Sequence, residues 1–225
     1  MNDRHLLTSS DAYKAIHSEM SSFFHLNRRF PEDVYRVGGS RTVFMEYETG
    51  INPRFWPTLS RLAQINGDEN VDFMVVNPAH GSVNVPASWN VYPAFSMPVS
   101  ASAAEFGDAL TEPTPDDDNF WLIGDLSEVI AITGASGLWG CWGEQSSGIM
   151  AIRAADTGEF QRWREDIDLH WWGTYGILDI IAPNCRDWRI PHEFLDPFVD
   201  NYRWTLQPQA LERMAFGKTA DPNQK

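Results

Sequence analysis

Hydrophobic and polar positions alternate with two different periods along this chain, and the two periods predict both helices and strands. Apolar residues recur at helical spacing over residues 8–24 and again over 156–171. Residues 42–48 instead alternate one by one, as in a strand that buries one face. Short apolar runs bounded by turn residues predict four more strands, over 71–76, 120–124, 128–133 and 148–154.

The remaining segments give weaker signals. Further helices are expected over 52–65, 192–201 and 207–216, each with a proline near its beginning. Residues 175–182 fit either a strand or a buried helix, because the periodicity of so short an apolar run does not decide between them. Residues 77–118 contain six prolines and are expected to be mostly irregular, with a brief helix over 101–110.

The order of these elements predicts the fold class. Three neighbouring strands with short links favour an antiparallel meander. We therefore expect one α+β domain over residues 1–217, a mostly antiparallel sheet packed by helices, followed by a polar tail over 218–225. The 156–171 helix should pack Phe160, Trp163 and Ile167 against the sheet.

Composition narrows the class of protein. The chain has 225 residues, of which 43% are hydrophobic and 21% charged, as in an ordinary globular domain. No stretch approaches the ~20 apolar residues of a membrane helix, so no membrane association is expected. Residues 1–11 lack a basic region followed by an apolar one, so we expect no secretory signal. Two cysteines make no disulfide framework, and the expected location is cytoplasmic.

Charge is concentrated in the middle of the chain. The formal net charge is -14, yet the 91 residues from 62 to 152 hold twelve acidic residues and neither Lys nor Arg. The flanks hold 17 basic and 19 acidic residues. Such a negative surface disfavours binding to nucleic acid. It is either a docking face for a basic partner or a solvated surface of a lysine-poor protein.

The docking interpretation names a set of residues. Acidic side chains near the predicted 120–133 hairpin would form a charged rim, and two tryptophans in a glycine-rich loop would be exposed apolar anchors. The predicted partner-binding residues are Asp116, Asp117, Asp118, Asp125, Glu128, Trp139, Trp142 and Glu144.

Catalytic and cofactor motifs give no decisive signal. Glycines at 134, 137, 140 and 143 repeat every three residues, but no lysine or following helix completes a phosphate loop, so a tight hairpin loop is expected. No nucleophile elbow and no zinc or calcium spacing is found, so no catalytic residue, metal or cofactor is predicted. Glu46 and Glu48 would share one face of a strand and could pair as carboxylates.

The combination of an α+β fold, an acidic block and no catalytic motif resembles the immunity proteins of bacterial polymorphic-toxin systems. The resemblance is at the level of class and lies in Phe-Trp-Leu-Ile-Gly-Asp at 120–125, the strand 129–133 and Trp-Gly-Cys-Trp-Gly at 139–143, within the acidic block. It implies a small, acidic, cytoplasmic α+β protein, not an enzyme, that binds and blocks a cognate toxin. No functional residue is carried over from it.

The leading hypothesis is therefore an immunity-type protein that blocks a basic toxin domain through an acidic face. Two other hypotheses remain at this point. One is a hydrolase-like enzyme with a dispersed active site. The other is a carbohydrate- or small-ligand-binding module that uses exposed tryptophans.

Overall fold

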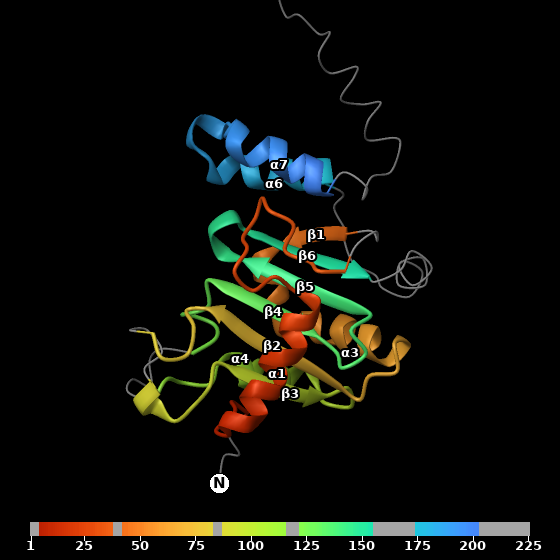
Figure 1. The fold of residues 1–225 in the computed structure, drawn as a ribbon, viewed down its shortest axis with the longest axis vertical. Helices are drawn as coiled ribbons and strands as arrows, with labels where there is room; N and C mark the ends of the chain where they lie inside the picture. The colour runs from red at the N-terminus through yellow and green to blue at the C-terminus, as the bar shows by residue number, and fades with distance from the viewer. Residues whose placement is uncertain (1–4, 38–41, 83–86, 116–121, 155–173, 203–225) are drawn as a thin grey trace, which may run out of the picture.

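A six-stranded sheet forms the centre of the computed structural model, which describes residues 5–37, 42–82, 87–115, 122–154 and 174–202 (Figure 1). The strand order is β1-β6-β5-β4-β2-β3, and every neighbouring pair is antiparallel. The strands are β1 (Thr42–Glu46), β2 (Asn70–Asn77), β3 (Ala94–Pro98), β4 (Val129–Thr133), β5 (Trp139–Glu144) and β6 (Ile149–Ala154).

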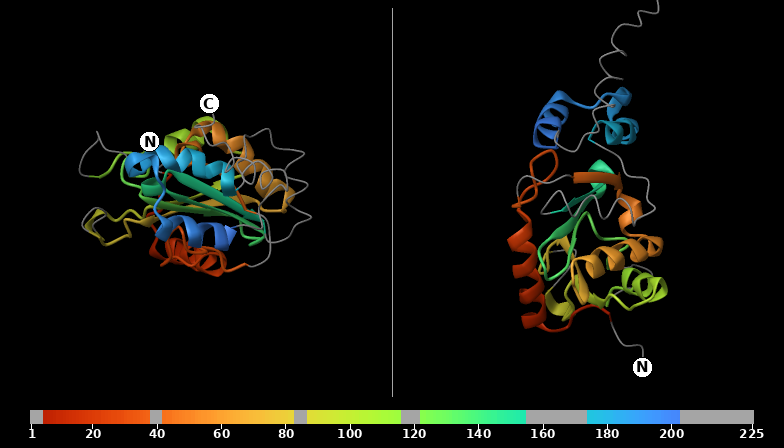
Figure 2. Two further views of the ribbon diagram at one scale, coloured as in Figure 1. Left: turned by 90° about the horizontal axis from the view of Figure 1, so that it is seen from above. Right: turned by 90° about the vertical axis from the view of Figure 1, so that its right-hand side faces the viewer.

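Helices lie on both faces of this sheet. The α-helices are α1 (Ser10–Phe23), α2 (Tyr47–Gly50), α3 (Trp56–Ile65), α4 (Ala103–Leu110), α6 (Thr174–Ile181) and α7 (His192–Tyr202). Short 3-10 turns are η1 (Pro53–Phe55), η2 (Ala87–Trp89), η3 (Gln145–Ser147), η4 (Ala182–Asn184) and η5 (Arg186–Trp188). The right-hand view of Figure 2 shows α1 on one side of the sheet and α3 and α4 on the other. The predicted class, one α+β domain with an antiparallel sheet packed by helices, is confirmed.

The alternation of side chains along the strands creates two cores. Phe73, Ile132 and Cys141 point to the face covered by α2, α3 and α4. Phe44 and Ala131 point to the opposite face, where α1, the 24–37 segment, α6 and α7 pack. Because the sheet is covered on both sides, its central strands β4, β5 and β6 are buried along their whole length.

Most of the predicted elements are confirmed. Strands occupy the expected positions near 42–48, 71–76, 128–133 and 148–154, and the brief helix near 101–110 is α4, with a capping box between Ser102 and Glu105. The helices expected over 8–24, 52–65 and 192–201 are α1, η1 with α3, and α7. The ambiguous run 175–182 is helical. The helices predicted over 156–171 and 207–216 lie outside the described residues.

The sequence predictions for residues 122–124 and for residues 139–143 are wrong. Leu122 and Ile123 form a buried turn rather than a strand, because Leu122 N–H donates to Glu112 O (3.0 Å) and Gly124 N–H to Leu110 O (3.1 Å) at the end of α4. The expected glycine-rich loop at 139–143 is the central strand β5. Its backbone pairs with β4 on one side and β6 on the other.

Glycine is required at one position of β5 by close packing. A Cβ atom on Gly140 would lie 2.6 Å from ring atoms of both Phe23 and Phe24, which end α1. The absence of a side chain therefore lets α1 approach the sheet. The glycine pattern serves helix–sheet packing, and no phosphate-binding loop is formed by it.

The unexpected edge strand is β3, within the segment expected to be irregular. It pairs with β2 in register Phe73↔Phe95, and those two rings stack at 4.9 Å. Beyond it, Leu7 N–H donates to Ala94 O over 2.9 Å, so the chain before α1 covers the beginning of this strand. β3 thus forms although Pro93 precedes it and Pro98 ends it, because its apolar side chains pair with those of β2.

Candidate partner-binding face

The two tryptophans predicted as exposed anchors are buried. Trp139 and Trp142 are both 0% exposed, so the prediction that they lie in an open loop is wrong. Trp139 lies in the core beneath α3, and Trp142 lies in the core beneath α1. They are three positions apart on one strand and therefore point to opposite faces. Neither ring is at the surface to contact a protein or stack on a sugar.

Glu144, a third predicted contact residue, is also buried. Its Oε1 accepts hydrogen bonds from the Trp142 indole N–H and from Phe30 N–H, both at 2.8 Å. Burial raises the pKa of Glu144, while these two donors and the charge of Arg29 oppose that rise. This carboxylate fixes the 24–37 segment against β5, so its role in the fold is structural and the prediction of a surface contact is wrong.

Other acids of the central block are also occupied by internal contacts. The Asp68 carboxylate accepts from Ser136 N–H (2.6 Å), the Ser136 hydroxyl (3.0 Å) and the Trp139 indole N–H (2.8 Å). Glu112 Oε2 accepts from the backbone N–H groups of His5 (2.8 Å) and Leu6 (3.1 Å). Three acids of the block, Asp68, Glu112 and Glu144, therefore accept hydrogen bonds from backbone, hydroxyl or indole donors of the fold.

Two of the predicted contact residues are exposed. Asp125 and Glu128 lie in the turn that precedes β4, and both side chains are at the surface. Glu128 accepts a hydrogen bond from the side chain of Asn77 at the end of β2. Asp116, Asp117 and Asp118 lie outside the described residues.

A buried tyrosine brings a second acidic segment to this turn. The Tyr47 hydroxyl donates to Ser127 O (2.8 Å) and lies 2.9 Å from the Ser127 hydroxyl, across 80 residues of sequence. Burial raises the pKa of Tyr47 to about 12, so the hydroxyl keeps its proton and remains a donor. Its chain neighbours Glu46 and Glu48 are exposed. They stand at the end of β1 and in α2, so the expected carboxylate pair on one strand face is not formed.

These four exposed carboxylates define an acidic rim at one end of the sheet: Glu46, Glu48, Asp125 and Glu128. Backbone hydrogen bonds connect its parts through the β5–β6 turn. Gln145 N–H donates to Glu128 O (2.9 Å), and Tyr47 N–H donates to Gly148 O (2.9 Å). The rim therefore rests on the ends of β1, β4, β5 and β6, a rigid support for a charged surface.

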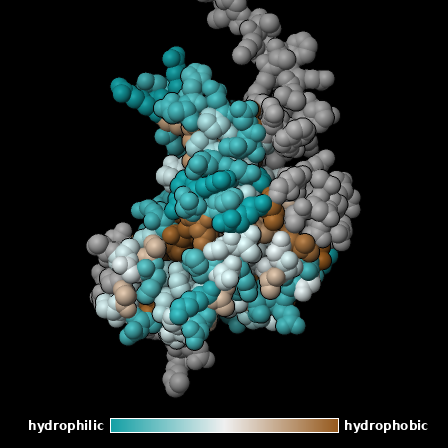
Figure 3. All heavy atoms as spheres, viewed as in Figure 1, coloured by the Kyte–Doolittle hydropathy of each residue, from teal (hydrophilic) through white to brown (hydrophobic). Residues whose placement is uncertain are grey.

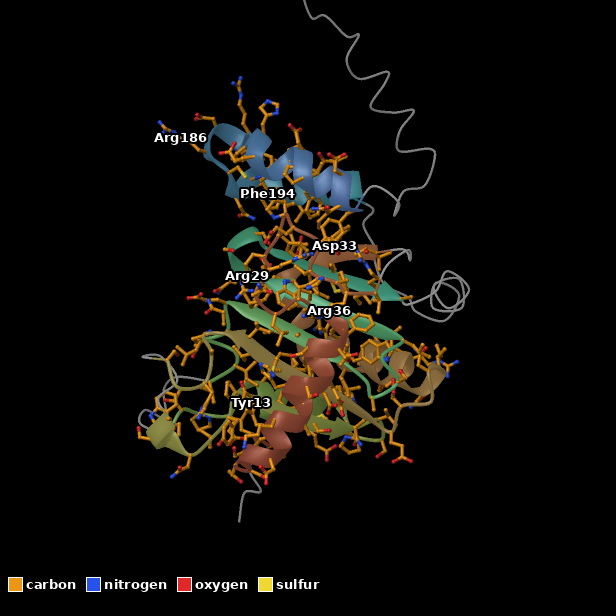
Figure 4. The ribbon with its side chains drawn as sticks, in the orientation of Figure 1. Tyr13, Arg29, Asp33, Arg36, Arg186 and Phe194 are labelled. Atoms are coloured by element: carbon orange, nitrogen blue, oxygen red, sulfur yellow. The ribbon has the colours of Figure 1, made fainter. Side chains whose placement is uncertain are left out.

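An exposed tryptophan that was not among the predicted contact residues follows a segment that approaches the β5–β6 turn of this rim. Trp188 is 73% exposed and ends η5. The adjoining Asn184 amide approaches the β5–β6 turn, 3.1 Å from where a Cβ of Gly148 would lie. Figure 4 shows the neighbouring Arg186 pointing away from the body of the protein. A tryptophan within the polar run 183–189 was the available sequence signal.

A buried cation lies at the other end of the sheet. Arg153 of β6 forms an ion pair with Asp33 (3.0 Å) and donates to the Thr42 hydroxyl (2.8 Å). Its guanidinium carbon lies 4.2 Å from the Tyr35 ring centroid and 5.5 Å from that of Tyr202. In Figure 4, Asp33 lies between the sheet and α7. This cluster joins four parts of the chain, the 24–37 segment, β1, β6 and α7, and its role is structural.

A pair of carboxyl groups lies between α1 and β2. Glu19 is partly exposed and Asp72 is buried, and burial followed by the hydrogen bond with Asp72 raises the pKa of Glu19 to about 7. The charges of Asp72 and Asp68 act in the same direction. The pair therefore holds a proton at weakly acidic pH.

We expect this pair to make stability depend on pH. The raised pKa means that folding favours protonated Glu19, so its contribution is complete below about pH 4.5 and is lost as pH rises through about 7. Glu19→Gln should be about 1 kcal/mol more stable than the native chain at pH 8, after allowance for solvent screening, and equal to it at pH 4.5. Urea unfolding at the two pH values measures this. The exposed Glu193→Gln on α7 is the control, and an equal effect of Glu19→Gln at both pH values would contradict the prediction.

The described residues contain no helix that is long and apolar enough to cross a membrane. Among those same residues, no group of three or more His, Cys, Asp or Glu side chains is arranged to hold a metal ion. Comparisons with protein-family models, with curated proteins and with solved structures found no match for this chain.

Proposed function

We propose that this chain is a cytoplasmic immunity-type protein that binds and blocks a basic toxin domain through the acidic rim. The observation that carries the proposal is the contact of Tyr47 with Ser127, which unites two acidic segments on one surface. All four rim carboxylates are exposed, and the whole chain has a net charge of -14. A basic protein would be attracted to this surface over a distance comparable with the Debye length.

The mechanism that fits this surface is occlusion. A rigid acidic surface placed over a cationic active site excludes the substrate without any chemistry by the inhibitor. Electrostatic attraction raises the association rate, and contacts in the centre of the interface slow dissociation. The class-level resemblance to immunity proteins supports a partner encoded by the adjoining reading frame.

We expect charge removal at the rim to slow association with that neighbour-encoded protein. The variant Glu48→Gln/Asp125→Asn should lower the association rate constant about 3- to 10-fold at 20 mM salt and leave it nearly unchanged at 500 mM salt. Binding kinetics on an immobilised partner measure both rates. Glu128 is kept because it also accepts from Asn77.

A matched control removes the same charge elsewhere. Asp11→Asn/Glu69→Gln changes two exposed acids that lie away from the rim, at the first turn of α1 and before β2. The control should associate at the native rate. Equal slowing by both double variants would mean that only net charge matters, and absence of binding by the native chain would overturn the proposed function.

A further inference from the structure

Trp188 is unlike the other large apolar side chains of the described residues. Among the described residues, only Trp188 and Leu138 are exposed large hydrophobic residues, and they are 73% and 38% exposed. Arg186, Asp187 and Arg189 around Trp188 are exposed as well. Figure 3 shows that the surface around α6 and α7 is mainly hydrophilic in that view. The exposed indole ring leaves a large apolar surface in contact with water, and burial against a partner surface would be favourable.

The backbone holds this ring outward in a strained conformation. Asp187 and Trp188 have φ angles of 57° and 59°, in the left-handed region that favours glycine. Trp188 N–H donates to Cys185 O (3.1 Å), and Arg189 N–H donates to Arg186 O (3.2 Å). Two consecutive residues other than glycine in this region are rare, and such strain concentrates at functional sites.

The strained turn is attached to the same end of the sheet as the acidic rim. Gly148 bonds to Tyr47 of the rim region through its carbonyl, and its Cα faces the Asn184 amide. Trp188 follows Asn184 by four residues, so the Cα atoms of these two residues are at most ~14 Å apart. One protein surface of ordinary size can therefore cover the rim and the tryptophan together.

We propose that Trp188 is the apolar anchor of the partner interface, inserting into an apolar pocket of the basic protein that the acidic rim attracts. Arg186 and Arg189 flank the indole and would bond to carboxylates or carbonyl groups at the border of that pocket. Tryptophan and arginine are the side chains that most often dominate binding energy at interfaces. This inference rests on the proposed function and supplies the anchor that Trp139 and Trp142 do not provide.

The test uses a substitution that the backbone accepts. Trp188→Gly removes the ring and fits a positive φ, so its melting temperature should equal or exceed that of the native chain. Its Kd for the neighbour-encoded protein should rise at least about 30-fold, through faster dissociation, with the association rate within about 3-fold. Trp188→Phe should recover much of the affinity. Leu138→Ala, in the β4–β5 turn at the opposite end of the sheet, is the control and should bind as the native chain does.

The outcomes separate the two proposals. If Trp188→Gly binds within 3-fold of the native chain while the rim variant associates slowly, the anchor is wrong and the proposed function stands. If the native chain does not bind at all, both are overturned. Equal weakening by Leu138→Ala would also overturn the anchor. Replacing Trp188 by a photoreactive benzoylphenylalanine should crosslink to the bound partner, and failure to crosslink while binding persists would count against it.

Discussion

Asp33→Ala is expected to lower the free energy of unfolding by about 3–5 kcal/mol, because it leaves the Arg153 cation buried without its counter-ion. Arg153 is 4% exposed, whereas Asp33 is about one-third exposed. The Thr42 hydroxyl, the Val37 carbonyl and the tyrosine rings remain, and they stabilise the cation only in part. Urea unfolding followed by far-UV circular dichroism measures the loss.

The double variant Asp33→Ala/Arg153→Met makes this prediction specific. Methionine keeps much of the volume between Tyr35 and Tyr202 and carries no charge, so the double variant should be more stable than Asp33→Ala alone. Asp33→Asn keeps an acceptor for Tyr35 N–H, which lies 3.2 Å from Oδ1, and is the milder control. Additive losses in the double variant would show that the ion pair is not the source of the effect.

Asp68→Ala should lower the free energy of unfolding by about 2–4 kcal/mol, although Asp68 belongs to the acidic block. The substitution leaves the indole N–H of fully buried Trp139 and the N–H and hydroxyl of Ser136 without their acceptor. The double variant Asp68→Ala/Trp139→Phe removes the buried indole donor as well. Its free energy of unfolding should fall by less than the sum of the decreases in the two single variants. Urea unfolding midpoints at pH 7 provide the comparison.

An acid from the same block is the control for Asp68. Asp108→Ala, on the exposed side of α4, should change the free energy of unfolding by less than about 0.5 kcal/mol. Equal destabilisation by the two substitutions would contradict the structural role of Asp68. The contrast separates carboxylates that stabilise the fold from those that only charge its surface.

The fold class was predictable because side-chain periodicity reports burial. Strands β2, β4 and β6 and helices α1, α4 and α7 have apolar positions at regular spacing, so the sequence locates them. Strand β5 lacks that signal. Its Trp-Gly-Cys-Trp-Gly segment has a glycine, Gly140, where the rings at the end of α1 pack. Its strand conformation comes from pairing with β4 and β6.

The candidate site was predictable only in part. Charge counting identified Asp125 and Glu128, but it placed Glu144 on the surface because sequence does not show which carboxylates meet internal donors. Glu46 and Glu48 join the rim through a tyrosine contact that spans 80 residues. Trp188 escaped notice because its exposure depends on a backbone conformation that no local pattern encodes.

The edge strand β3 has a consequence for how these molecules behave when crowded together. An open strand edge is a template on which a neighbouring molecule can continue the hydrogen-bond ladder. Here Pro93 and Pro98 lie directly before and at the end of β3, and neither has an N–H to donate. Leu7 already uses Ala94 O. Growth of intermolecular sheets from this edge is thereby interrupted, and concentrated protein is protected against fibre-like aggregation from that side.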